Sequence, residues 1–222
     1  WMTTFGDTAF AHHAAAARIA SAMLLRLANA DIVPYDYVEF AQTMRRHLPA
    51  LDAQLARLPA QRPGSDGLAA AIDRMEAAAA RFAAARDSAL RGDVAGPKRI
   101  ATNAALREVE RALTRADGLR TRPWYRTLIY AADENNGYSN VVFPSVVEAA
   151  RRGDADLALG ELVDLATRFD AATAALERAR RSAGRIEAPL HYSRADLVKR
   201  VKMAWFRAPV HAGFAAFHGP AL

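Results

Sequence analysis

An irregular, aromatic-rich segment interrupts a chain that otherwise has the pattern of long alanine-rich helices. It begins at Arg122 with the phrase Arg-Pro-Trp-Tyr-Arg and continues from Asn136 to Pro144. Helix–helix connections in bundles usually take about 2–8 residues, so a plain bundle does not need a connection of this length. A long ordered loop that carries several aromatic residues is more often functional than incidental. We therefore expect function to lie in this loop.

Apolar residues elsewhere recur at steps of three and four, the periodicity of helices that bury one face. Helices are predicted at 7–30, 35–58 (bent or divided at Pro49), 68–92, 97–117, 144–153 and 154–183. Asp7 is the expected N-cap of the first, and Ala16, Ile19, Ala20, Met23 and Leu27 form its expected core stripe. The fourth helix is expected to bury Ile100, Ala104, Leu106, Val109 and Leu113. The sum is an all-α, antiparallel helical bundle with one long aromatic-rich crossover loop.

Composition narrows the class of protein. A chain of 222 residues can bury one substantial core, and a hydrophobic fraction of 52% argues against disorder. Cysteine is absent, which excludes disulfides and thiolate nucleophiles from this chain. No apolar run approaches the ~18–20 residues that span a bilayer, and no signal-peptide pattern opens the sequence. Because the chain begins at Trp1, we expect it to start inside a longer reading frame. Its compartment stays open, and an export signal of the parent would lie upstream.

The net charge of +6 comes almost entirely from arginine. Most arginines alternate with acids along the helices, which is typical of solvated faces with ion pairs rather than of a nucleic-acid surface. The segment 184–222 differs, because prolines interrupt it and the run from Ser193 to Arg207 resembles a short basic helix with aromatic residues. We interpret it as a C-terminal basic extension that packs on the bundle or is mobile, and docking on an anionic partner is the alternative.

No catalytic constellation emerges from the residues themselves. The histidines, which are His12, His13, His47, His191, His211 and His218, show no local metal-ligand spacing. Ser139 and Ser145 lack a nucleophile-elbow setting. The neighbouring acids Asp133 and Glu134 could in principle do acid–base work, although solvated turn residues are the commoner explanation. We therefore predict no catalytic residue and no metal site in this chain.

Two phrases, about 90 residues apart, resemble the glutamate carboxypeptidase II and transferrin receptor family. The first comprises Phe5–Phe10 and Leu27–Asp36, and the second is the Arg-Pro-aromatic-Tyr-Arg phrase followed by Ile-Tyr-Ala at Ile129. The resemblance covers residues 1–183 and implies the family's C-terminal helical dimerisation domain. In that family the two zinc ions and the general base belong to an α/β peptidase domain, whose last metal ligand lies shortly upstream of the matching region.

The resemblance also implies what this region contributes. In the family it provides a homodimer contact and one wall of the pocket for a peptide substrate, next to the peptidase domain of the same chain. The wall corresponds to Asn136, Gly137 and Tyr138, where glutamate-specific members carry a lysine–tyrosine pair. Here the tyrosine is present and the lysine position is Gly137, which removes a charge-assisted contact to a substrate carboxylate. A broader aminopeptidase or dipeptidase role fits the resemblance equally well.

Two other classes of function stay open. The helices would serve equally well in a receptor-like binding module whose peptidase domain has lost its metal ligands. A freestanding basic bundle could instead hold nucleic acid or anionic lipid through Lys199, Arg200, Lys202 and Arg207, with affinity that falls steeply with salt. We favour the dimerisation domain of a zinc-dependent exopeptidase, silent by itself, and expect no nucleic-acid partner.

Overall fold

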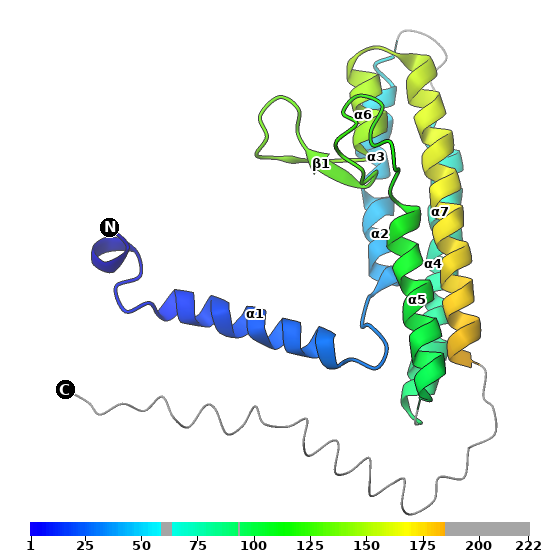
Figure 1. The fold of residues 1–222 in the computed structure, drawn as a ribbon. Helices are drawn as coiled ribbons and strands as arrows, with labels where there is room; N and C mark the ends of the chain where they lie inside the picture. Colours follow the sequence, from blue (N-terminus) through cyan, green and yellow to red (C-terminus); the bar gives the residue numbers. More distant parts are fainter. Residues whose placement is uncertain (59–63, 93, 185–222) are drawn as a thin grey trace, which may run out of the picture. The chain divides into compact units, whose positions relative to one another are not determined.

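The computed structural model describes residues 1–58, 64–92 and 94–184, which are mainly helical (Figure 1). After a π-helical turn at Met2–Gly6 the helices are α1 (Ala11–Asn29), α2 (Tyr37–Arg46), α3 (Leu48–Leu55), α4 (Asp66–Leu90), α5 (Gly96–Ala112), α6 (Pro144–Arg151) and α7 (Ala155–Gly184). Between α5 and α6 the strands β1 (Tyr130–Ala132) and β2 (Asn140–Val142) pair as an antiparallel hairpin, with Ala131 opposite Val141. The predicted all-α class is confirmed, and the hairpin within the loop was not predicted.

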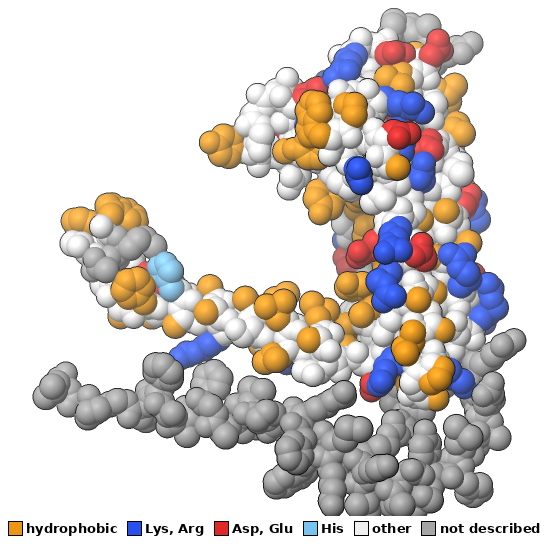
Figure 2. All heavy atoms as spheres, in the orientation of Figure 1, with side chains coloured by type: hydrophobic (Ala, Val, Ile, Leu, Met, Phe, Trp, Pro, Cys, Tyr) orange, Lys and Arg blue, Asp and Glu red, His pale blue; other side chains and the backbone are white. Residues whose placement is uncertain are grey.

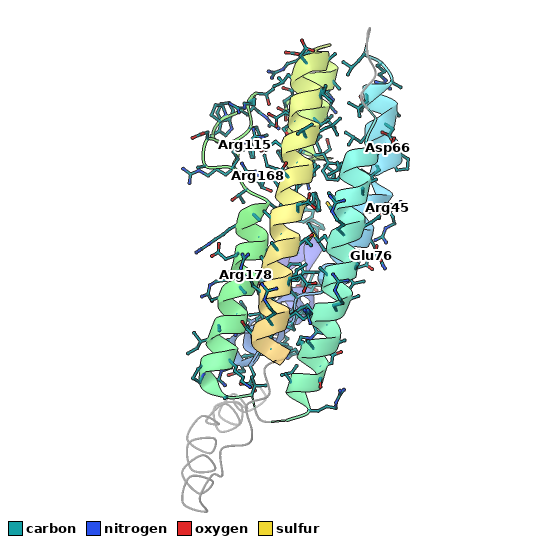
Figure 3. All side chains as sticks on the ribbon, turned by 90° about the vertical axis from the view of Figure 1, so that its right-hand side faces the viewer. Arg45, Asp66, Glu76, Arg115, Arg168 and Arg178 are labelled. Carbon is teal, nitrogen blue, oxygen red and sulfur yellow. The ribbon has the colours of Figure 1, made fainter. Side chains whose placement is uncertain are left out.

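The two longest helices, α4 and α7, run in the same direction. Arg74 of α4 pairs with Asp170 of α7, and Arg81 pairs with Glu177, each 96 residues further along the chain. A constant offset of this kind arises only between parallel helices. The α2–α3 pair and α5 run the opposite way beside them (Figures 1 and 3). The chain therefore passes up and down the bundle, and the aromatic loop and α6 return it to the starting end of α7.

Alanine supplies much of the buried surface of α4 and α7. This pair makes the most extensive helix contact among the described elements. Both helices bury alanines almost completely; these are Ala71, Ala78 and Ala79 on α4 and Ala158, Ala172, Ala175 and Ala179 on α7. A methyl side chain lets two helix backbones approach closely while it retains high helix propensity. The alanine-rich composition is thus a packing feature of this bundle.

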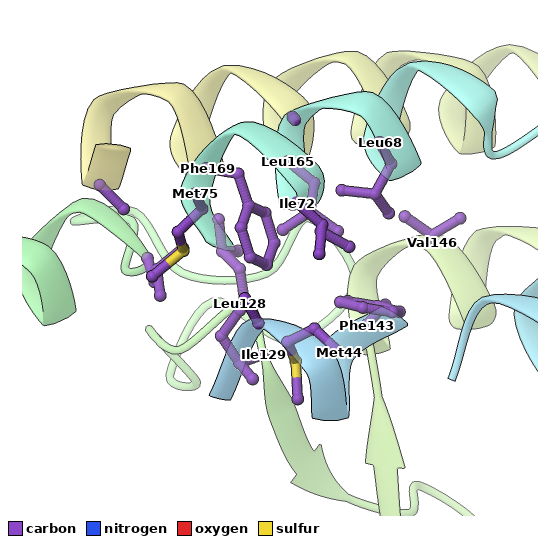
Figure 4. Close-up of a cluster of buried hydrophobic side chains, with 14 of the residues drawn as sticks. Met44, Leu68, Ile72, Met75, Leu128, Ile129, Phe143, Val146, Leu165 and Phe169 are labelled. Atoms are coloured by element: carbon purple, nitrogen blue, oxygen red, sulfur yellow. The ribbon is translucent and has the colours of Figure 1, made fainter. Parts of the chain in front are cut away.

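The aromatic loop contributes side chains to the hydrophobic core. Leu128 and Phe143 are fully buried, and they meet Ile72, Val146 and other side chains of α2, α4, α6 and α7 (Figure 4). Phe143 adopts a left-handed conformation (φ 54°) directly before Pro144, which opens α6. Proline suits this first helical position because its amide would have no partner there. The core therefore fixes both ends of the hairpin.

Helix boundaries follow the sequence pattern with instructive exceptions. The predicted division near Pro49 is confirmed, because α2 ends at Arg46 and α3 begins at Leu48. The fourth helix ends at Ala112, earlier than predicted, because the segment after it pairs with the aromatic loop: the Arg115 amide donates to the Arg126 carbonyl oxygen at 2.8 Å. Its predicted core residue Ile100 is exposed, which corrects that assignment. The expectations for 184–222 fall, apart from Gly184, outside the described residues.

The predicted core stripe of the first helix is also wrong as a packing prediction. The helix forms, yet none of its residues is buried. Asp7 does act at its start, although Phe10 occupies the N-cap position: a carboxylate oxygen of Asp7 accepts a hydrogen bond from the backbone amide of His13 at 2.9 Å. In the part of the chain that the structure describes, no helix is both long and apolar enough to cross a bilayer.

Candidate functional site

The loop between β1 and β2 holds the three residues predicted for the substrate pocket. Its ends are closed by a hydrogen bond from the Asp133 amide to the Ser139 carbonyl oxygen at 2.8 Å. The side-chain oxygen of Asn136 accepts from the amides of Tyr138 (2.9 Å) and Ser139 (3.1 Å). Gly137 supplies the left-handed turn, with φ of 69°. The local sequence therefore makes a structured tip in which Asn136 organises the backbone.

Tyr138 is the group that this tip presents to the outside. Its side chain is 99% exposed, and a Cβ atom at the neighbouring Gly137 would meet no other atom within contact distance. A fully exposed tyrosine at the end of a folded loop contributes little to the core of the described residues. Its hydroxyl group can still donate to a carboxylate or accept from an amide of a ligand.

A buried ion pair fastens the base of the hairpin to α6. Glu148 is completely buried and accepts hydrogen bonds from the guanidinium of Arg122 and the hydroxyl of Thr121. The same guanidinium donates to the carbonyl oxygen of Ala132 at 2.8 Å, at the end of β1. It also lies 4.6 Å from the ring centre of Tyr125. Arg122 thus connects the Arg-Pro-Trp-Tyr-Arg phrase, α6 and the start of the tip.

The neighbouring acids of the loop serve as further anchors. Asp133 pairs with Arg151 at 3.1 Å and Glu134 pairs with Arg152 at 3.2 Å, both arginines lying at the end of α6. The amide of Asn135, followed by Arg151, holds the pKa of Asp133 below its usual value, although burial acts in the opposite direction. A carboxylate with a lowered pKa and an arginine partner is a poor proton donor or acceptor near neutral pH. The geometry therefore supports a structural role for both acids.

A second buried network holds the other end of the loop against α7. Arg115 donates to Glu161 at 2.7 and 3.1 Å and to Asp164 at 2.6 Å (Figure 3 shows Arg115 and Arg168 beside α7). Burial alone would lower the pKa of Arg115, but the bonds to Glu161 and Asp164 raise it. Burial would raise the pKa of Asp164, and its bonds to Arg115 and Arg168 lower it instead. Arg115 and Asp164 therefore stay charged at neutral pH, and the network holds the loop against α7.

The described histidines and serines are the remaining candidates for metal binding and nucleophilic chemistry. Among residues 1–58, 64–92 and 94–184, no group of three or more histidine and acidic side chains could hold a metal ion. His13 bonds the carboxylate of Asp7 at 2.6 Å. Ser145 is buried in α6, and Ser139 bonds within the loop tip. His191, His211 and His218 lie outside the described residues.

Surface charge on the bundle is paired, as the sequence pattern indicated. Figure 2 shows basic and acidic side chains interspersed on the face that it views. Several pairs join different helices, as Arg74–Asp170 does between α4 and α7, and others, such as Arg111–Glu108, lie within one helix. The pattern predicted the pairing, but the partner helices depend on tertiary packing. A mixed surface of this kind offers no large basic patch on the face shown.

Comparison with known proteins decides the family. The model of the transferrin receptor-like dimerisation domain matches residues 65–177, a range that includes α4, α5, the aromatic loop, α6 and most of α7. The chain belongs to this family. The family resemblance predicted from the two sequence phrases is thus confirmed.

Curated relatives of this dimerisation-domain chain are peptidase-like proteins. It is 34% identical over 149 residues to a "probable glutamate carboxypeptidase" of Arabidopsis thaliana, a match that covers 67% of this chain and 21% of the relative. A protein of the same description from Arthroderma benhamiae is 27% identical over 154 residues (69% and 21%). An "inactive zinc metalloprotease" of Schizosaccharomyces pombe is 27% identical over 191 residues (78% and 22%). The matched part of the chain thus spans about a fifth of the length of these relatives.

Sequence reasoning found the loop but missed its anchors. The predicted residues Asn136, Gly137 and Tyr138 are adjacent in one exposed tip. The partners that hold this tip, Arg122 and Glu148, lie 26 residues apart, and no local spacing links them. The signal available in the sequence was Glu148, an acid among the apolar residues of the predicted helix 144–153. An acid on a buried helix face requires a cationic partner.

Proposed function

We propose that this chain is the self-associating and pocket-completing helical domain of a zinc-dependent exopeptidase of the glutamate carboxypeptidase type. The observation that carries the proposal is the family match over 65–177, which includes the whole loop from Arg122 to Tyr138. Relatives described as glutamate carboxypeptidases support the peptidase context. The zinc ions and the general base would lie in another domain of the longer protein, and this chain alone would be catalytically silent.

The role in the pocket rests on the loop tip. Tyr138 is exposed, while the groups at the base of the tip are tied to α6 by ion pairs. A fixed base with an exposed hydroxyl suits a group that must meet a ligand in a defined position. With Gly137 beside it, the tip lacks an ammonium group for a substrate carboxylate. We therefore propose a peptide substrate with recognition broader than a terminal glutamate.

We assign the self-association to an apolar surface of α7. Leu159 and Val163 lie one turn apart on this helix and are both exposed. They fall inside the region that matches the dimerisation-domain model. We propose that this face packs against a second copy. Contacts between other domains of the longer protein would add to it.

Sedimentation analysis of the purified chain tests the self-association directly. We expect a dimer whose dissociation constant rises at least tenfold in Val163→Asp, because a buried carboxylate without a partner opposes association. Ile100→Asp, which also places a charge at an exposed apolar position, serves as the matched control and should leave the dimer intact. A chain that stays monomeric, or a dimer unaffected by Val163→Asp, would contradict the assignment of this face.

A second candidate function is a receptor-like binding module without peptidase activity. It is favoured by one observation, the similarity to a relative described as an inactive zinc metalloprotease over 78% of this chain. The described helices fit both functions, which differ in whether another domain of the longer protein binds zinc. Zinc content and peptide hydrolysis by the longer polypeptide that contains this chain distinguish them: bound zinc with hydrolysis supports the exopeptidase, and neither supports the binding module.

A further inference from the structure

The tip of the hairpin contains an asparagine that is directly followed by a glycine, Asn136 before Gly137. The other four asparagines of the chain precede residues that have a side chain, which are Ala30, Ala104, Asn136 and Val141. Residues 135–140 are all exposed, and a Cβ atom at Gly137 would meet no other atom within contact distance. Because glycine has no Cβ, its amide nitrogen can approach the side chain of the preceding residue with the least steric resistance.

Three hydrogen bonds converge on the side-chain oxygen of Asn136. The amides of Tyr138 and Ser139 donate to it at 2.9 and 3.1 Å, and the hydroxyl group of Ser139 donates at 3.2 Å. A backbone amide is a donor only, so the atom that these amides meet is the oxygen of the Asn136 side chain and not its nitrogen. The side-chain nitrogen is the other branch of the same carbon, Cγ, and takes no part in these three bonds.

This arrangement of donors has the features of an oxyanion hole. If the amide nitrogen of Gly137 attacks Cγ of Asn136, the side-chain oxygen gains negative charge in the tetrahedral intermediate. Donors that are already in place stabilise such a charge without reorganisation. Hydrogen bonds to an ionised oxygen are about twice as strong as bonds to a neutral one, so all three bonds strengthen as the charge develops.

One hydrogen bond of the tip opposes this attack. The amide of Gly137 donates to the carbonyl oxygen of Asp133 at 2.9 Å, and its proton must leave when the nitrogen attacks. This bond joins two neutral groups, and its loss costs less than the gain of three bonds that acquire a charged acceptor. The hydrogen bonds of the folded tip therefore favour the attack on balance.

We propose that Asn136 and Gly137 form a self-modification site, at which the folded tip converts Asn136 through an internal succinimide. The nitrogen of Gly137 forms a bond to Cγ of Asn136 and gives its proton to a solvent base. The bond between Cγ and the side-chain nitrogen breaks, and this nitrogen takes a proton from solvent and leaves as ammonia. Water then opens the succinimide ring at either of its carbonyl carbons, and the product is an aspartate or an isoaspartate at this position.

Either product changes the surface that the tip presents. A new carboxylate lies next to the exposed Tyr138, and an isoaspartate also places an additional methylene group in the main chain of the turn. The modification itself concerns this chain alone and does not depend on the proposed exopeptidase. In the longer protein the added charge would disfavour a ligand carboxylate beside Tyr138, because like charges repel.

Peptide mapping of the purified chain tests the modification directly. The chain is incubated in mildly alkaline buffer made with heavy-oxygen water, and the tryptic peptide 127–151 is analysed by mass spectrometry with fragmentation. We expect Asn136 to be converted at least about tenfold faster than Asn135, which lies in the same exposed tip but precedes a residue with a side chain. The products should include isoaspartate as well as aspartate, each with labelled oxygen. Equal conversion of the two asparagines, or aspartate alone, overturns the proposal.

The same measurement in urea, which unfolds the chain, tests the role of the folded tip. We expect faster conversion in the folded state, because the three donors are in place there, and slower conversion than in urea overturns the proposal. Ser139→Ala should slow conversion of the folded chain about two- to tenfold and leave the rate in urea unchanged. Ser88→Ala, which removes an exposed hydroxyl group from α4, is the matched control. Equal rates of the two folded variants would exclude the Ser139 hydroxyl group from the site and contradict the oxyanion-hole explanation.

Discussion

Arg115 and Glu161 form a two-point ion pair although both side chains are buried. The two nitrogen–oxygen distances are 3.1 and 2.7 Å, and the pair joins the segment after α5 to α7. A bidentate guanidinium–carboxylate pair has defined geometry as well as charge compensation. The desolvation of two buried charges is offset only while each has its partner. This pair therefore fixes the position of the loop more than it adds net stability.

Removing one member of this pair should be costly. We expect Glu161→Ala to lower the unfolding free energy by about 3–5 kcal/mol, because Arg115 would remain buried with only Asp164 as a charged partner. The double variant Arg115→Met with Glu161→Leu should lose clearly less than the sum of the single variants. Urea denaturation measures all of them. Arg81→Ala, which breaks an exposed pair with Glu177, is the control and should lose less than about 1 kcal/mol.

Two glycines with the same backbone conformation should respond differently to alanine. Gly118 and Gly137 both have φ of 69°. A Cβ atom at Gly118 would overlap the backbone carbonyl of Pro123, whereas Gly137 has open space around it. Gly137→Ala should cost about 1–2 kcal/mol for the left-handed conformation alone. Gly118→Ala must in addition displace the turn, and we expect a loss of at least about 3 kcal/mol by thermal or urea unfolding. Equal losses would contradict this explanation.

The lowered pKa of Asp164 predicts that the folded protein loses stability in acid. Its pKa lies below the ordinary value of 3.8 in the folded protein, because its bonds to Arg115 and Arg168 outweigh the effect of burial. The folded state thus binds this proton more weakly than the unfolded chain. The stabilisation is complete above the unfolded pKa and is lost as pH falls through the folded one. Unfolding free energies measured between pH 6 and pH 2 should show a shallower acid decline in Asp164→Asn than in the original chain.

A completely buried alanine of α7 should tolerate no larger side chain. Ala175 is completely buried on α7, and its neighbour Ala174 is exposed. Ala175→Leu must shift α7 against its neighbours or force strained rotamers, and we expect a loss of about 1–3 kcal/mol. Ala174→Leu makes the same chemical change toward solvent and should stay within about 0.5 kcal/mol. Thermal unfolding of the two variants is a sufficient comparison.

Tyr138 should affect substrate recognition without affecting folding. Because it is 99% exposed, Tyr138→Phe should leave the stability of this chain unchanged. In the longer protein, loss of a hydroxyl bond to a charged substrate group should lower kcat/KM about 10- to 100-fold, mainly through KM. Tyr130→Phe removes a hydroxyl from another exposed tyrosine at the base of the hairpin and is the control. Equal effects of the two variants would exclude Tyr138 from the pocket.

Local periodicity was enough to predict most of the bundle. Ile72, Met75 and Phe82 recur at helical spacing on one face of α4, and all three are buried. The division near Pro49 and the start of α6 at Pro144 follow from the ring of proline, which restricts its own residue and the one before it. These features depend on residues within a few positions of one another, and such information is present in the sequence itself.

Tertiary structure alone decided which apolar and charged residues have partners. Ile19 and Ile100 fit the helical stripes as well as Ile72 does, yet both are exposed, because no described element lies against them. Likewise, Glu148 resembles any helical acid until the fold places Arg122 beside it. The sequence determined where helices form, since that depends on neighbouring residues. The burial of a face and the pairing of a charge depend on segments that are distant in the chain, so only the folded structure could assign them.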